Sequence, residues 1–321
     1  MPRDAAEPAS WKVAPGVVLV DTGYVRPRLA AAYLVRGSSS AAVVETGARS
    51  AVPRILAALE ADGIGRDEVS HVVVTHVHLD HAGGAGALLR ELPRARLVVH
   101  PRGARHLVDP SRLVQGSVAV YGEERFRALY GEIVPAPAER VVEAGEGFAL
   151  DLGGRPLRFL DAPGHAKHHF VVLDEASRGF FTGDCFGVSY RETDLSGRPF
   201  LFPTTTPVQF DPPALHATID RMMAERPERM YLTHFGMVDG GVAGHAQALH
   251  RAIDEHVRIA RAAPAGPGRR EALRAGLERQ LLSGLEAHGA RMARDEALAV
   301  FGGDLDLNAQ GLEVWLDASA R

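Results

Sequence analysis

A short run of potential metal ligands follows an apolar stretch, and it constrains this chain more than any other feature. Residues 71–74 read His-Val-Val-Val, a valine-rich pattern typical of a buried strand. Residues 75–84 read Thr-His-Val-His-Leu-Asp-His-Ala-Gly-Gly, and helix-forming residues 85–92 follow the two glycines, which allow a tight turn. The pattern therefore predicts a strand that delivers polar side chains to a loop before a helix.

Three histidines and one aspartate lie close together in this loop. His76 and His78 alternate with Val77, so an extended backbone would project both imidazoles to one side. Asp80 and His81 lie where the chain turns, and they can face a second ion. A polar loop with incidental histidines does not account for ligands at this density. The loop therefore predicts a site for two metal ions.

The sequence Thr-His-x-His-x-Asp-His-x-Gly-Gly resembles the signature of the metallo-β-lactamase-fold hydrolases. That family has three further ligand positions downstream, and this chain has candidates in the same order, at 161–165 (Asp-Ala-Pro-Gly-His), 180–184 (Phe-Phe-Thr-Gly-Asp) and 230–234 (Met-Tyr-Leu-Thr-His). The resemblance covers residues 15–240 and implies an α/β fold, a four-layer αββα sandwich. We expect a hydrolase domain over residues 1–240 and a C-terminal helical extension over residues 241–321.

The resemblance also implies a ligand set for two divalent metals. It assigns the first metal to His76, His78 and His165, the second to Asp80, His81 and His234, and a bridging position to Asp184. Zinc is the expected metal, with iron or manganese as alternatives. A water held between two such ions should lose a proton near neutral pH, because a single catalytic zinc lowers the pKa of bound water to about 7. Asp80 is then placed to orient the resulting hydroxide or to receive a proton.

Four further residues lie near the downstream ligands. His169 aligns with a supporting histidine of the family, so it is either a hydrogen-bonded core residue or a group that orients a ligand. His168 stands where the family has glycine. Cys185 directly follows Asp184, but neighbouring residues on a strand point to opposite faces, so we expect a buried structural thiol. Tyr190 is a candidate for contacting the substrate carbonyl, as a tyrosine does in the related lactonases.

Differences at the ligand positions separate this chain from some branches of the family. Zinc β-lactamases generally lack a carboxylate where Asp184 stands, and flavodiiron proteins carry Glu where this chain has His78. The pattern is therefore most similar to the branches that contain glyoxalase II, the acyl-homoserine lactonases and acyl-CoA thioesterases. We expect a hydroxide-dependent hydrolase of a small ester, lactone or thioester. The alternatives are a di-iron oxidoreductase that binds oxygen or nitric oxide, a phosphodiesterase with the same site, and a binding module without activity.

The amino-acid composition limits which binding partners and which cellular compartment are expected. The chain has 321 residues, 46% of them hydrophobic, and a formal charge of −4, so we expect a small-molecule substrate and no nucleic acid. One cysteine excludes an intramolecular disulfide, which suits the cytoplasm. Residues 1–10 are polar and acidic, so no export signal is expected, and no apolar run is long enough to predict a membrane span.

Two connecting segments and the C-terminal region remain open to more than one interpretation. Residues 109–139 contain Tyr121, Phe126 and Tyr130, and they form either a substrate-lining insertion or a pair of packing helices. Residues 187–211 are rich in Pro, Thr and Phe and predict a loop beside the site. Beyond residue 240 the apolar spacing is helical, and these helices could cap the cleft, form a homodimer interface or pack on their own domain.

Overall fold

The computed structural model describes residues 9–205 and 208–319, which form two compact units. Unit 1 comprises Met1–Phe159 and Asp174–Ser177, and unit 2 comprises Leu160–Leu173 and Arg178–Arg321. This division does not test the expected boundary between residues 240 and 241, which stays a prediction. No helix in the described ranges is both long and apolar enough to cross a bilayer.

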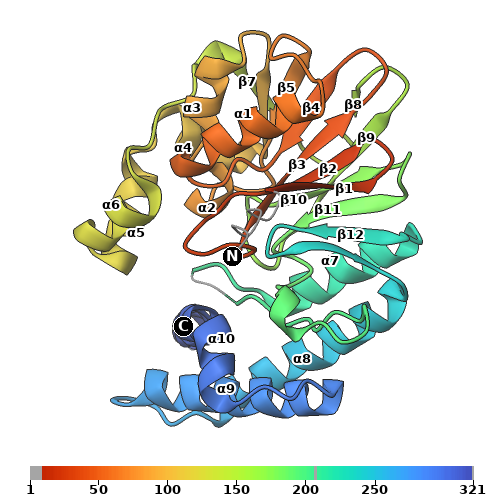
Figure 1. Cartoon of the computed structure of the whole chain (residues 1–321). Coiled ribbons are helices and arrows are strands. Elements are labelled where there is room, and N and C mark those ends of the chain that lie inside the picture. The colour runs from red at the N-terminus through yellow and green to blue at the C-terminus, as the bar shows by residue number, and fades with distance from the viewer. Residues whose placement is uncertain (1–8, 206–207, 320–321) are drawn as a thin grey trace, which may run out of the picture. The chain divides into compact units, whose positions relative to one another are not determined.

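Unit 1 is built on a seven-stranded mixed sheet in which the strands follow chain order (Figure 1). Strands β1 to β4 pair antiparallel and β4 to β7 pair parallel. The strands are β1 (Ser10–Ala14), β2 (Val17–Asp21), β3 (Ala31–Arg36), β4 (Ala41–Val44), β5 (Val69–Val73), β6 (Arg96–Val99) and β7 (Val141–Glu143). Apolar runs rich in valine and alanine at residues 16–21, 29–35, 41–45, 71–74 and 96–99 predict strands, and β2 to β6 match them, because such residues pack well between covered faces.

Helices cover this sheet and complete the core of unit 1. Ile55 and Leu59 of α1 pack with Leu88 and Leu89 of α3 against the strand valines, and all of these side chains are buried. The helices are α1 (Val52–Ala61), α2 (Leu79–Ala82), α3 (Ala85–Glu91), α4 (Pro101–Val108), α5 (Ser111–Tyr121) and α6 (Glu123–Tyr130), with short 3-10 turns η1 (Arg49–Ala51) and η2 (Ala138–Arg140). Proline at the start of α1 and α4 suits a first turn, where no intrahelical N–H bond is lost.

The second sheet has six strands in the order β13-β12-β11-β10-β9-β8. Its strands are β8 (Ala149–Asp151), β9 (Pro156–Asp161), β10 (Phe170–Asp174), β11 (Gly179–Gly183), β12 (Arg229–Leu232) and β13 (Gly236–Asp239). β11 and β12 pair parallel, whereas β8–β9 and β12–β13 pair antiparallel. Two mixed sheets with flanking helices confirm the expected fold class.

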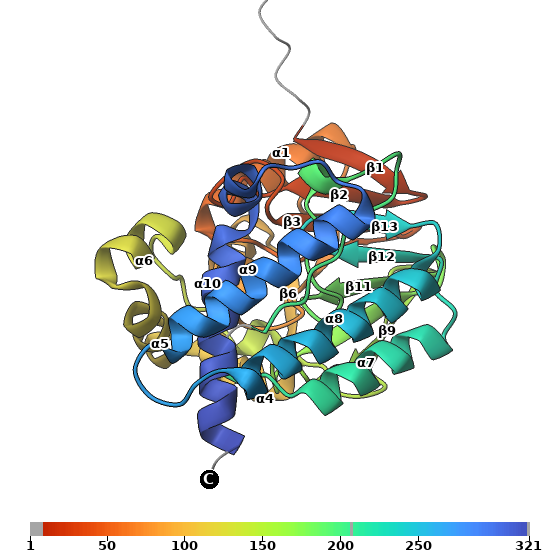
Figure 2. The same ribbon diagram turned by 90° about the horizontal axis from the view of Figure 1, so that it is seen from below.

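Four long helices belong to unit 2. They are α7 (Pro212–Ala224), α8 (Val242–Ala262), α9 (Arg269–His288) and α10 (Arg294–Ser319), and a 3-10 turn η3 (Arg191–Thr193) precedes them. Asp211 caps α7 by accepting a hydrogen bond from the N–H of Ala214 at 3.1 Å. Figure 2 shows α7, α8 and α9 in a row, with α10 crossing α9. The helices expected beyond residue 240 are therefore confirmed, and they pack on one another within this unit.

Candidate metal centre

His76, His78 and His81 of unit 1 lie just after β5, where the chain leaves the sheet and enters the single turn of α2. The Nε2 atom of His76 lies 2.8 Å from Nδ1 of His78, and Nε2 of His81 lies 3.7 Å from a carboxylate oxygen of Asp80. His76 and His81 are fully buried, whereas Asp80 keeps 21% of its side chain exposed. The four expected ligands of this loop therefore lie together within unit 1.

Glu45, the residue after β4, contacts this cluster through its carboxylate. Its carboxylate accepts hydrogen bonds from the Thr75 hydroxyl and from the Thr75 backbone N–H, the latter at 3.3 Å, and it lies 3.0 Å from Nδ1 of His81. An ionised carboxylate only accepts, so this contact places the proton of a neutral His81 on Nδ1 and leaves Nε2 able to bind a metal. From the sequence, Glu45 was expected only as the last residue of a strand over residues 41–45. An acidic residue ending a buried strand was the available signal.

The ligand candidates of unit 2 follow three different strands. His165 follows β9, Asp184 follows β11 and His234 follows β12. The turn before His165 requires Gly164, because a Cβ there would lie 2.4 Å from the backbone of Leu215 and its φ is +127°. Residues far apart in sequence thus meet at one edge of the unit.

Asp184 presents its two carboxylate oxygens to two different imidazoles. Oδ2 lies 3.4 Å from Nε2 of His165, and Oδ1 lies 3.7 Å from Nε2 of His234. Asp184 is 5% exposed and both histidines are buried. A residue that bridges two metals needs one oxygen for each of them, and the two oxygens of Asp184 face two different histidines. The donor set of unit 2 therefore fits the expected ions.

His169 and Cys185 support Asp184 through its backbone. The Nε2 atom of His169 accepts a hydrogen bond from the N–H of Asp184 at 3.3 Å, and its Nδ1 lies 3.5 Å from Sγ of Cys185. The thiol donates to the carbonyl of Ala162 at 3.3 Å. Burial, and then the charge of Asp184, raises the pKa of the Cys185 thiol. Cys185 is therefore a protonated, buried thiol, which agrees with the structural role expected from the sequence.

Tyr190 lies in the core of unit 2 next to α10. Its side chain is 1% exposed, and its hydroxyl lies 3.1 Å from each carboxylate oxygen of Asp304. Its ring packs 5.0 Å from the ring of Phe301. This environment gives Tyr190 a structural role, and the substrate contact proposed for it stays a prediction.

Aromatic side chains of the 109–139 segment gather near Asp80 in unit 1. The segment forms α5, which has no buried residue, and α6, whose Phe126 and Tyr130 pack in one cluster with Tyr24. Tyr24 donates to the Tyr130 hydroxyl at 3.0 Å. Burial, and then the charge of Asp80, raises the pKa of both tyrosines. The segment is thus a pair of packing helices, and its aromatic cluster lies within electrostatic reach of Asp80.

The seven His and Asp side chains are groups that can hold metal ions, and they are consistent with a dinuclear metal site. Unit 1 contributes two imidazoles that face each other and an Asp-His pair, while unit 2 contributes a carboxylate flanked by two imidazoles. Imidazole nitrogen and carboxylate oxygen suit zinc, iron and manganese alike. The donor set therefore does not select one of these metals.

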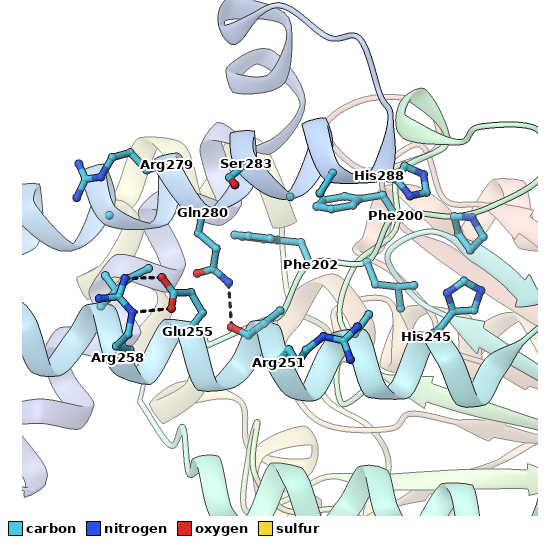
Figure 3. A pocket seen from close by; sticks show the side chains of 18 of the residues that line it. Phe200, Phe202, His245, Arg251, Glu255, Arg258, Arg279, Gln280, Ser283 and His288 are labelled. Carbon is cyan, nitrogen blue, oxygen red and sulfur yellow. Dashed lines mark hydrogen bonds and ion pairs between the residues drawn. The ribbon is translucent and has the colours of Figure 1, made fainter.

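A cavity of about 730 Å³ lies between α8 and α9 in unit 2, walled on one side by residues 198–202 (Figure 3). We call it the α8–α9 cavity. Phe200 and Phe202 line it together with Gln280, which reaches from α9 to donate to the carbonyl of Ala252 at 2.9 Å. This cavity was not expected from the sequence. Two residues after this wall the chain reaches Thr204, which contacts two of the candidate metal ligands.

The chain belongs to the metallo-β-lactamase superfamily, whose sequence profile matches residues 25–234. This match spans all seven candidate ligands. A crystal structure of a metallo-β-lactamase family protein from Thermus thermophilus has the same fold, with a TM-score of 0.66, 20% sequence identity, and coverage of 96% of this chain and 95% of that chain. The superfamily expected from the ligand pattern is therefore confirmed, and its branch is not resolved.

Curated relatives carry several different functions in their names. A metallo-β-lactamase fold-containing protein of Sulfurisphaera tokodaii is 26% identical over 216 residues, which are 66% of this chain and 75% of that protein. A type A flavoprotein of Rhodobacter capsulatus is 31% identical over 50% of this chain, and an atrochrysone carboxyl ACP thioesterase of Aspergillus fumigatus is 26% identical over 47%. The chain spans only 32% and 38% of the length of these last two proteins.

Proposed function

We propose that the protein is a dinuclear metal-dependent hydrolase of a small ester, lactone or thioester. The observation on which this rests most is the placement of Asp184, whose two oxygens face His165 and His234 separately. In the proposed site, unit 1 adds the ligands His76, His78, Asp80 and His81. Superfamily membership across both ligand groups supports joining them into one centre.

Different residues of the chain would have different roles in the proposed hydrolysis. Two bound divalent ions would supply a nucleophile at neutral pH and polarise the carbonyl that gains charge. Asp184 would hold the two ions at a fixed separation, and Glu45 would keep Nε2 of His81 free of a proton for binding. Asp80, whose side chain is 21% exposed, would orient the water and accept its proton at a carboxylate oxygen.

The thioesterase among the relatives supports a carbonyl substrate, and the partly buried Tyr121 of α5, which packs on the aromatic cluster, lies within electrostatic reach of Asp80. The loops that would set the substrate differ among the members of such a family. We propose that the protein belongs with the glyoxalase, lactonase and thioesterase branches and not with the β-lactamases, because zinc β-lactamases generally lack a carboxylate where Asp184 stands. A small-molecule substrate, a cytoplasmic location and a homodimer formed through α8–α10 are parts of the same proposal.

The second candidate function is a di-iron oxidoreductase that binds oxygen or nitric oxide. The specific observation in its favour is the match to a type A flavoprotein. A site of histidines and carboxylates can hold iron as well as zinc. His78 argues against this candidate, because the flavodiiron signature carries a glutamate at that position.

One experiment separates these candidates. Protein purified without added metal is analysed for zinc, iron and manganese, and is then assayed on lactones, acyl thioesters, aryl esters and phosphodiesters, with Asp184→Ala as the control protein. We expect two metals per chain and metal-dependent turnover of a carbonyl substrate. A redox-active iron pair with no turnover of any ester, lactone or thioester would reject the hydrolase. Turnover confined to phosphodiesters would replace it with a phosphodiesterase.

A further inference from the structure

Thr204 connects two candidate metal ligands of unit 2 with one hydroxyl group. Its Oγ1 donates to the backbone carbonyl of Asp184 at 2.8 Å and lies 3.4 Å from Nδ1 of His165. Thr204 is 5% exposed and His165 is 1% exposed, so water does not compete for these contacts. The threonine lies two residues after Phe202, the last residue of the 198–202 wall of the α8–α9 cavity.

The proton inventory of these atoms gives the direction of each hydrogen bond. A threonine hydroxyl has one proton, and the Asp184 carbonyl can only accept it. The contact with His165 must therefore run the other way, from an N–H at Nδ1 of His165 to the oxygen of Thr204. A neutral His165 with its proton on Nδ1 presents a lone pair at Nε2. Nε2 is the atom that faces the Asp184 carboxylate at 3.4 Å.

Thr204 is itself held in place by α10. The side-chain oxygen of Asn308 accepts from the N–H of Thr205 at 2.7 Å, and its side-chain nitrogen donates to the carbonyl of Pro203 at 2.8 Å. The Thr205 hydroxyl donates to the backbone carbonyl of Asn308 at 3.2 Å. Asn308 is 1% exposed. One buried amide thus fixes the residue before Thr204 and the residue after it.

The geometry points to Thr204, anchored by Asn308, as a positioning residue that sets the tautomer of His165 so that Nε2 is available to a metal. This inference rests on the proposed function insofar as it takes His165 as a ligand. It gives α10 a defined part in the metal site, although its Asn308 lies more than 100 positions after Thr205 in the chain. Hydrogen bonds from the non-ligating nitrogen of a metal-bound histidine typically change metal affinity by about 10 to 100-fold.

The test compares four variants of the full-length chain, of which one, Asn308→Ala, removes the amide that anchors the residues on both sides of Thr204. Thr204→Val keeps the shape and removes the hydroxyl, Thr204→Ser keeps the hydroxyl, and Thr193→Val removes a different buried threonine hydroxyl, which donates to the Tyr190 carbonyl at 2.7 Å. The first readout is the affinity for Zn²⁺ alone, measured by titration calorimetry. The second is the tautomer of His165 in the metal-free protein, read from imidazole ¹⁵N chemical shifts. Circular dichroism confirms that each variant is folded.

We expect Thr204→Val to weaken Zn²⁺ binding by about 10 to 100-fold and to lose the Nδ1–H tautomer of His165. Thr204→Ser should restore both, and Thr193→Val should change neither. Asn308→Ala should weaken Zn²⁺ binding in the same direction as Thr204→Val. Unchanged affinity and an unchanged tautomer in Thr204→Val would overturn the inference, as would a loss of equal size in Thr193→Val. Neither readout needs a substrate. The role of Thr204 can therefore be tested even if the protein hydrolyses no ester.

Discussion

The imidazole of His169 accepts a hydrogen bond from the backbone N–H of Asp184. This contact orients the peptide that carries the proposed bridging carboxylate, while His169 itself offers no atom to the metal in our assignment. We therefore predict that His169→Ala lowers kcat/KM by about 10 to 100-fold without abolishing activity. Steady-state kinetics on the best substrate measures this, with His106→Ala on α4 as the control. A loss as large as that of His165→Ala would show that His169 is a ligand.

Asp184→Ala should remove the bridge between the two ions. We expect fewer than two metals per chain by elemental analysis and no measurable turnover, because both metal groups depend on this carboxylate. Asp220→Asn is the matched control, since Asp220 is 73% exposed and lies on α7. Chelation of the wild-type protein should lower its melting temperature, because a ligand that binds only the folded chain stabilises it. Full activity in Asp184→Ala would refute the bridging assignment.

Arg155 and Asp174 form a buried ion pair in unit 1. The guanidinium donates to both carboxylate oxygens, at 3.0 and 2.6 Å, and the side chains are 8% and 0% exposed. Asp174→Asn should cost about 3–5 kcal/mol of unfolding free energy, since it leaves a buried charge without its partner. Urea unfolding measures this.

The neighbouring pair Arg158–Glu175 supplies the control for that measurement. Its side chains are 41% and 45% exposed and lie 2.7 Å apart. Glu175→Gln should cost less than about 1 kcal/mol, because exposed ion pairs contribute little. Equal costs at Asp174 and Glu175 would mean that burial does not govern the strength of these pairs.

His256 on α8 should make the protein acid-sensitive. Desolvation lowers its pKa to about 4, and its side chain is fully buried. The unfolded chain binds this proton near pH 6.5, so this group destabilises the fold progressively as pH falls from about 6.5 towards 4, by up to about 3 kcal/mol, and has no effect above that range. Unfolding free energies of wild type and His256→Gln, compared across pH 4–8, measure the difference. Parallel pH profiles would contradict it.

Sequence periodicity predicted most strands because their physical cause is local. The valine-rich strands β2, β5 and β6 are largely buried. A strand covered on both faces shows up in the sequence as a short, nearly continuous apolar run. β1 and β13 were not predicted, because Ser-Trp-Lys-Val-Ala and Gly-Met-Val-Asp mix polar and apolar residues without a clear alternation. The single turn of α2 was taken for a bend, since four residues are too few to show helical spacing.

The supporting residues of the candidate site could not be found by the same reasoning. Glu45 contacts Thr75 across 30 positions, and Asn308 contacts Thr205 across 103 positions. Such contacts depend on how strands and helices pack, so the local periodicity of the sequence does not predict them. The ligand candidates themselves were recognisable because each follows an apolar strand in a fixed motif.

The chain passes between the two units at three places, because Asp174–Ser177 belongs to unit 1 while the residues on both sides of it belong to unit 2. A fragment ending at Phe159 would therefore keep the buried guanidinium of Arg155 and lose the carboxylate of Asp174 that pairs with it. Neither unit is one continuous stretch of the chain, so a single cut in the gene would yield neither of them whole.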